Sequence, residues 1–171
     1  MRIPYVADPP PSTSPSDDAI VARIRARRAP RPLLHLDLAL LHSPPLADGW
    51  NSFLGAIRTQ STLGADLREL AICRVAVCNK AWFEWSAHAP LARKGGVPEQ
   101  GMEAIKVERL PEARLEGLTQ RQWVVVLYAD EMTRNVEVKD ETFELLKKEF
   151  NDREIVELTT TVRHPLPLLG P

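Results

Sequence analysis

The stretch LRELAICRVAVCNKAWFEWSAHAPLARKGG (residues 67–96) decides the fold. Its first part, as far as Cys78, is apolar on most sides at helical spacing, which is typical of a helix at the centre of a domain. Its second part ends in Gly95-Gly96, a stop signal for a helix, and Pro98 suits the first turn of the next one. We therefore expect two consecutive helices here, the first of them central.

Helical periodicity and capping signals continue on both sides of this pair, from about residue 19 to residue 162. The segment 46–58 carries one apolar stripe that we expect to be buried: Leu46, Trp50, Phe53, Leu54 and Ile57. Thr119 and Gln122 have the spacing of a capping box. No convincing pair of strands is indicated. The predicted fold class is all-α, with six to eight helices.

Composition divides the chain into three parts. Residues 1–31 comprise a tail rich in proline and serine and a short basic helix, and residues 32–164 comprise the helical domain. Residues 165–171 form a proline-rich end that cannot continue the last helix. That helix is therefore expected to be cut short, and an altered reading frame or splice variant is one hypothesis for it.

The charge balance points to a small partner. The chain has 22 basic and 23 acidic residues, so no global field favours nucleic acid or an anionic membrane. The arginines between residues 23 and 31 follow two acids and have no aromatic residues between them, which argues against a nucleic-acid arm. No apolar run approaches the ~20 residues that cross a bilayer. We expect a cytoplasmic protein with a small-molecule substrate, and neither nucleic acid nor membrane as a partner.

Glu84 and His88 are the first candidates for chemistry. They lie four residues apart on one helix and so share a face. A carboxylate beside an imidazole can hold one tautomer or favour the charged ring, so that the ring exchanges protons near neutral pH. Glu69, a polar group in the apolar helix before, needs a partner, and His88 or a water is a candidate. Three aromatic side chains are expected to exclude water from the pair: Trp82, Phe83 and Trp85.

The plainer alternative is a solvated ion pair on a helix surface, which is what this spacing most often gives. The two cysteines offer little chemistry of their own. Cys73 and Cys78 differ by about 140° around a helix axis, so they cannot act as a vicinal dithiol and are expected in the core. A metal site would need two more convergent ligands than the sequence offers, so we expect no metal.

Two stretches, HSPPLADGWNSFLGAI (residues 42–57) and residues 67–97, resemble the carboxymuconolactone decarboxylase-like family, which is related to alkylhydroperoxidase D. The resemblance covers about two thirds of the chain. It implies the alkylhydroperoxidase D-like helical fold and a homo-oligomer, a trimer or a hexamer.

The resemblance also implies an activity. In the peroxidase branch a Cys-x-x-Cys precedes the histidine by four residues, and these positions fall on Ala81 and Glu84, which carry no thiol. The decarboxylase branch instead shows an aromatic-Glu-Trp before its histidine, which FEWSAH (residues 83–88) reproduces. This implies a carboxy-lyase that removes carbon dioxide from a small carboxylated lactone or related ring compound without a cofactor. The proton donor is then His88, which Glu84 and Glu69 orient.

The substrate carboxylate or developing enolate would be bound by basic residues nearby in the sequence, and the predicted substrate-binding residues are Arg74, Lys80, Arg93 and Trp85. Two alternatives stay open. One is a peroxidase of the same superfamily, and the other is a binding or assembly protein that keeps the fold without turnover.

Overall fold

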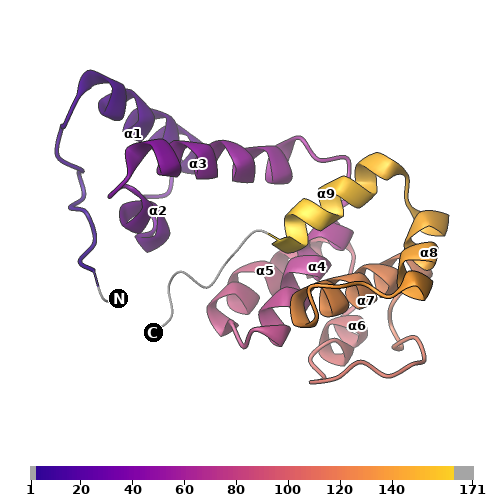
Figure 1. Cartoon of the computed structure of the whole chain (residues 1–171). Helices are drawn as coiled ribbons and strands as arrows, with labels where there is room; N and C mark the ends of the chain where they lie inside the picture. The colour runs from indigo at the N-terminus through magenta and orange to yellow at the C-terminus, as the bar shows by residue number, and fades with distance from the viewer. Residues whose placement is uncertain (1–2, 164–171) are drawn as a thin grey trace. The chain divides into compact units, whose positions relative to one another are not determined.

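A computed structural model of the chain describes residues 3–163, and within that range it contains nine α-helices and no strand (Figure 1). The predicted all-α class is confirmed. The helix count exceeds the expected six to eight, and the shortest helices are α2 (His35–Leu40) and α6 (Glu99–Ala104), with six residues each.

The described residues form two compact units, 3–60 and 61–163. The expected boundary after residue 31 stays a prediction, and the expected proline-rich end at 165–171 lies outside the described residues. In the first unit, α1 (Pro15–Arg28) packs against α3 (Pro44–Thr59), and α2 also contacts α3. A buried ion pair joins α1 to α2, with Arg28 donating two hydrogen bonds of 2.8 Å to Asp37.

Residues 3–14 contain no helix but contact the helices of their unit. The ring of Tyr5 stacks on that of His35, and the carbonyl of Pro4 lies 2.7 Å from His42 Nε2. Arg25 forms an ion pair with Asp8. Several basic side chains of α1 are thus paired with groups of the same unit rather than free for a polyanion.

The expected burial of the 46–58 stripe is partly wrong. Leu54 and Ile57 are buried, but Leu46 and Phe53 are exposed. The unit has only three helices, and α1 and α2 cover one part of the surface of α3. The apolar stripe on α3 is therefore wider than the part of its surface that α1 and α2 bury.

The second unit is built around α4 (Ala65–Cys78), as the apolar sequence predicts. Helix α4 packs against α5 (Trp82–Gly95), α7 (Gln120–Arg134) and α9 (Asp152–Arg163), and every residue from Glu69 to Val77 is buried (Figure 1). Helix α8 (Asp140–Glu149) packs on α7 and α9. A helix enclosed on several sides holds its polar side chains in fixed positions.

Two of the predicted helix signals are present in the second unit. Helix α5 ends at Gly96, whose φ of 111° is left-handed. The predicted capping box opens α7, with Gln122 N–H donating to the Thr119 hydroxyl and Thr119 N–H donating to the Gln122 side chain.

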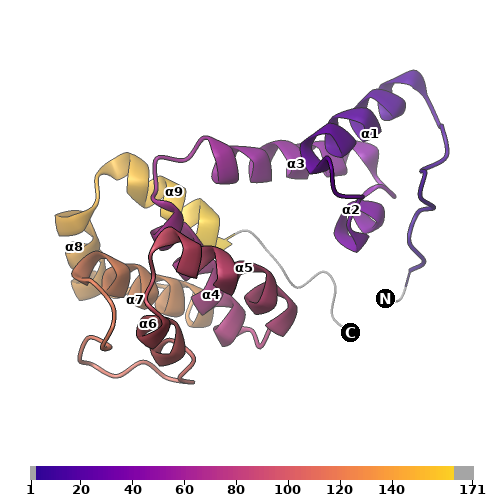
Figure 2. The same ribbon diagram turned by 180° about the vertical axis from the view of Figure 1, so that it is seen from behind.

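Residues 105–119 connect α6 to α7 without a helix, as Figure 2 shows from behind. One end of this connection is fixed by a close approach of two glycines. A Cβ on Gly101 would lie 2.8 Å from the Gly117 carbonyl oxygen, and one on Gly117 would lie 2.6 Å from the Gly101 nitrogen. Only glycine at both positions allows this contact without a backbone shift.

Candidate functional site

A carboxylate and an imidazole meet where α4 packs on α5. His88 Nδ1 lies 2.6 Å from Glu69 Oε2, and each residue is only 5% exposed. The sequence left His88 or a water as the partner of Glu69, and in the structure the partner is His88. A pair this short and this buried is far from the solvated alternative.

The two helices approach closely because small residues line the contact between them. Ala89 and Ala92 of α5 and Cys73 of α4 are buried in one cluster. At one end, a Cβ on Gly95 would lie 2.7 Å from the backbone nitrogen of Asp66. Asp66 is one turn before Glu69, and Gly95 is two turns after His88, so the close approach lies in line with the pair.

Glu84 completes the group on the other side of the ring. Its Oε2 lies 3.6 Å from His88 Nε2, so the predicted i, i+4 pairing is present. That distance exceeds a good hydrogen bond. The ring is therefore held firmly at Nδ1 and loosely at Nε2.

The hydrogen bonding sets the tautomer of the ring. An ionised Glu69 accepts a hydrogen bond from Nδ1–H, which leaves Nε2 as an acceptor in the neutral ring and as a donor in the charged ring. Burial by itself raises the pKa of Glu69, but the hydrogen bond and charge of His88 and the charge of Arg68 outweigh it and hold the pKa below its usual range. Glu69 is thus ionised near neutral pH, and Nε2 is the nitrogen available for proton transfer.

Arg68 is a member of this group that the sequence prediction missed. Its Nε donates to Glu69 Oε1 at 3.3 Å, so one carboxylate binds a guanidinium and an imidazole through its two oxygens. Neighbouring residues on a helix point in different directions, and spacing therefore gave no reason to pair them. The available signal was two adjacent charges in a mostly apolar helix.

Three aromatic side chains were expected to exclude water from the site, and for two of them this prediction is wrong. Trp82 is 56% exposed and Phe83 is 76% exposed, so neither excludes water from the pair. They occupy the first turn of α5, beyond the part of the helix that α4 buries. Trp85 is partly buried against the cluster that contains Cys73 and Ala89, and Lys106 Nζ lies 5.4 Å from the centroid of its ring.

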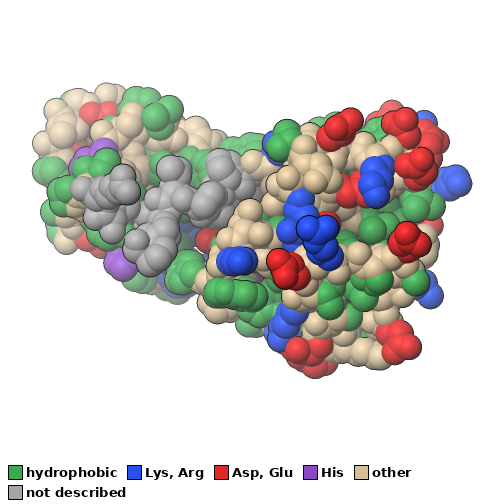
Figure 3. Space-filling view, turned by 60° about the horizontal axis from the view of Figure 1, so that its bottom comes forward, with side chains coloured by type: hydrophobic (Ala, Val, Ile, Leu, Met, Phe, Trp, Pro, Cys, Tyr) green, Lys and Arg blue, Asp and Glu red, His purple; other side chains and the backbone are tan. Residues whose placement is uncertain are grey.

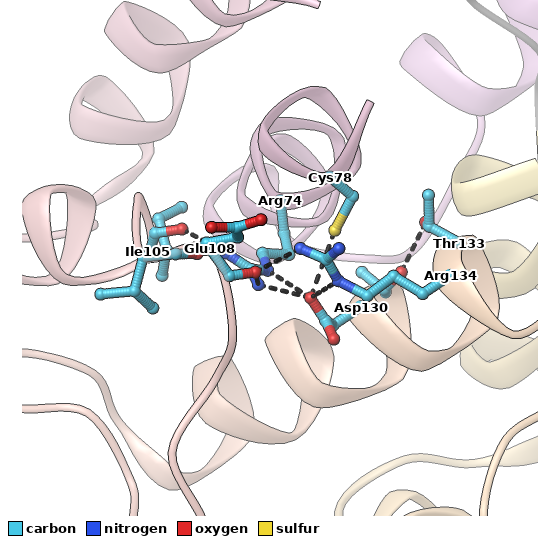
Figure 4. Close-up of polar contacts among 9 residues, drawn as sticks. Arg74, Cys78, Ile105, Glu108, Asp130, Thr133 and Arg134 are labelled. Carbon is cyan, nitrogen blue, oxygen red and sulfur yellow. Dashed lines mark hydrogen bonds and ion pairs between the residues drawn. The ribbon is translucent and has the colours of Figure 1, made fainter. Parts of the chain in front are cut away.

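Arg74 was predicted to bind substrate, but its guanidinium is bound inside the unit (Figure 4). The side chain is completely buried. Its Nε donates to Asp130 Oδ1 at 2.8 Å, its Nη2 also contacts that oxygen, and its Nη1 donates to the carbonyls of Ile105 and Val107 at 2.7 Å. A ligand arriving from solvent has no access to it, so the predicted substrate-binding role of Arg74 does not fit the structure.

The other predicted substrate-binding cations are Arg93 and Lys80. Arg93 is engaged by Glu99 through both Nε and Nη2. Lys80 is exposed in the turn between α4 and α5, with a left-handed φ of 54°. Their predicted roles remain predictions.

Both cysteine thiols are in unreactive surroundings. Burial and the charge of Glu69 raise the pKa of Cys73 to about 12. Burial likewise raises the pKa of Cys78 to about 11, and its thiol donates to Asp130 Oδ1 at 3.2 Å (Figure 4). Since the thiolate is the nucleophile in peroxide reduction, neither position favours that chemistry.

Over residues 3–163, no three His, Cys, Asp or Glu side chains gather in a way that could hold a metal ion, and no helix is long and apolar enough to span a membrane. Acidic and basic side chains are interspersed on the face that Figure 3 shows. A mixed surface of this kind offers no extended patch of one sign to a charged polymer.

Comparison with known proteins gives one match. The sequence model described as "Carboxymuconolactone decarboxylase family" matches residues 44–114, a span that includes Glu69, Glu84 and His88. Comparisons with curated proteins and with solved structures found no match. The resemblance predicted from the sequence is confirmed over residues 44–114, where the chain is similar to the carboxymuconolactone decarboxylase family.

Proposed function

We propose that this protein is a non-redox carboxy-lyase that acts on a small carboxylated lactone or a related ring compound, with His88 as the proton donor. The observation that carries the proposal is the buried 2.6 Å contact between His88 Nδ1 and Glu69 Oε2. It fixes the ring and directs Nε2 to proton transfer. Glu69 and Glu84 act by orienting the ring and setting its charge.

The reaction balances without an oxidant. The bond between the ring compound and its carboxylate breaks, and carbon dioxide leaves. The electron pair left behind spreads into the conjugated lactone, and a proton from His88 Nε2 is delivered to carbon. His88 then regains a proton from solvent, which completes the cycle.

The test is release of carbon dioxide from a panel of lactone acids and β-keto acids by the purified protein. Replacing His88 with Gln should lower the rate about 10²–10⁴-fold, the usual contribution of a general acid. His42→Gln is the matched control, because His42 is exposed and contacts only the carbonyl of Pro4 among the described groups. Equal release by the His88 variant and the parent protein would remove His88 from the mechanism.

The peroxidase alternative makes a different prediction. It needs a thiolate, and Cys73 and Cys78 are the only cysteines in the chain. If the protein consumes peroxide, and consumption stops when both cysteines are replaced by serine, the peroxidase reading is right and the carboxy-lyase reading is wrong. A protein that binds small acids but turns none over would be the non-catalytic alternative.

The homo-oligomer implied by the family, a trimer or a hexamer, is part of the proposal. The exposed Trp82, Phe83 and Leu91 on α5 support it, because large apolar side chains that lie on one short helix are often covered by another chain. Light scattering on the purified protein measures the mass directly. A monomer at micromolar concentration would contradict it.

A further inference from the structure

Arg68 has unused donors beside the candidate site. A guanidinium has five N–H donors, and among the described residues the one hydrogen bond that Arg68 makes is the 3.3 Å contact from Nε to Glu69. Among residues 3–163, no hydrogen bond or ion pair is made by its Nη1 or Nη2. The side chain is nevertheless only 14% exposed. Neither Nη atom of Arg68 is among the buried unpaired atoms of the described residues, so both reach the surface, where a polar ligand can meet them.

The other arginines of this region are placed differently. Arg74 has no exposed surface and is bound by Asp130 and by backbone carbonyls. Arg93 presents its Nε and Nη2 to Glu99, which is the two-point geometry that a carboxylate ligand would require. Arg68 is the arginine in direct contact with the Glu69–His88 pair that retains this geometry for a ligand.

The charges around His88 also require a cation. Glu69 lies on one side of the ring and Glu84 on the other, and two carboxylates repel an incoming anion. Arg68 and His88 bind the two oxygens of the same carboxylate, so the guanidinium and the ring are both held at Glu69. A planar, permanently charged group at that place offsets the repulsion and can bind a carboxylate at two points.

We propose that Arg68 is the anion-binding residue of this site. Its Nη groups bind the carboxylate of a small planar ring compound, whose ring then extends toward His88 Nε2. The inference rests on the proposed function for the identity of the substrate, but binding itself requires no turnover. It assigns to Arg68 the role that the sequence had suggested for Arg74, Lys80 and Arg93.

Benzoate, a planar ring carboxylate, is the probe, and benzamide is its neutral counterpart. In the parent protein, benzoate should shift the NMR signals of the Arg68 Nε–H and of the His88 ring, and benzamide should shift neither. Arg68→Gln should weaken benzoate binding at least about tenfold, because it removes the charge and the two-point geometry. Arg121→Gln, at an exposed arginine paired with Glu154, should bind as the parent protein does.

Absence of a benzoate-dependent shift at Arg68, or an Arg68→Gln variant that binds as tightly as the parent protein, would overturn the proposal. If Arg68→Gln does not fold, the parent measurement decides together with Arg68→Lys. That variant keeps the charge but loses the fork, and it should bind more weakly than the parent protein.

The anion site and the proposed mechanism fail in different ways. If benzoate binds through Arg68 but His88→Gln releases carbon dioxide as fast as the parent protein, the mechanism is wrong and the anion site stands. If His88→Gln abolishes release but benzoate leaves the Arg68 signal unmoved, the mechanism stands and the anion site is wrong.

Discussion

Replacing Asp130 with Asn should destabilise the unit formed by residues 61–163 by about 3 kcal/mol, near the lower end of what breaking a buried ion pair costs. One oxygen of Asp130 accepts from Arg74 Nε at 2.8 Å, from Arg134 Nε at 3.0 Å and from Cys78 Sγ at 3.2 Å. The amide keeps an acceptor but removes the charge, which leaves the completely buried guanidinium of Arg74 without a counter-ion. We expect a loss near the lower end of the range because the carbonyls of Ile105 and Val107 still bind Arg74 in the variant.

The assay is urea unfolding followed by tryptophan fluorescence in a Trp50→Phe background. The remaining tryptophans, Trp82, Trp85 and Trp123, all lie within residues 61–163, so the signal reports that unit. The control is Glu144→Gln, which removes an exposed pair with Lys147 and should cost at most a few tenths of a kcal/mol. Added salt should reduce the small effect of the control and leave the effect of Asp130→Asn nearly unchanged.

The pH dependence has a definite sign. Burial raises the pKa of Asp130, but hydrogen bonds from Arg134 and Arg74 outweigh it and lower the pKa below its ordinary 3.8. The pair therefore stabilises the fold above that value, and its contribution is lost as the pH falls through the lowered pKa. The difference between parent and variant should shrink in acid. A loss below about 1 kcal/mol at pH 7, the range of exposed pairs, would show that the pair is not a buried one in solution.

Three further changes test other parts of the second unit. Glu157 connects α9 to the residues before α4, and hydrogen bonds that outweigh its burial lower its pKa to about 2. Glu157→Gln should therefore lower the free energy of unfolding by about 1–2 kcal/mol at pH 7 in urea unfolding. This difference should disappear as the pH falls from 4.5 toward 2. Lys80→Gly should stabilise by about 0.5–1 kcal/mol in the same assay because it relieves a left-handed φ of 54°, whereas Lys80→Ala should not. Gly95→Ala places a Cβ 2.7 Å from the Asp66 nitrogen, so it should lower the free energy of unfolding by about 1–3 kcal/mol. It should also shift the His88 ring signals in NMR. Unchanged signals would mean that the helices adjust elsewhere.

Much of the fold could be predicted from the sequence because its signals are local. The central position of α4 follows from an apolar surface all round, and Gly96 and the Thr119–Gln122 box mark helix ends within one turn of chain. The exposure of Leu46 and Phe53 could not be predicted in the same way. Periodicity shows which face of a helix is apolar, but neighbouring helices decide how much of that face is covered.

In the candidate site, too, contacts within one helix could be predicted from the sequence and contacts between distant residues could not. Glu84 and His88 share a helix, and spacing alone placed them together. The partner of Arg74 is Asp130, 56 residues later, and no local rule connects two positions so far apart. The sequence did offer one sign that Asp130 binds arginine, since Asp130 and Arg134 stand four apart on a predicted helix. Arg74 was expected at the substrate because its actual partners come close to it only in the tertiary fold.

The connection between α6 and α7 is less free than its irregular backbone suggests. Its beginning is fixed where Arg74 binds the carbonyls of Ile105 and Val107, and its end is fixed where Gly117 meets Gly101. Surface loops normally accept insertions and protease cleavage along their length. Here both should concentrate in the short exposed span 111–114, which makes that span the natural place to add an affinity tag or a fluorophore without disturbing the helices.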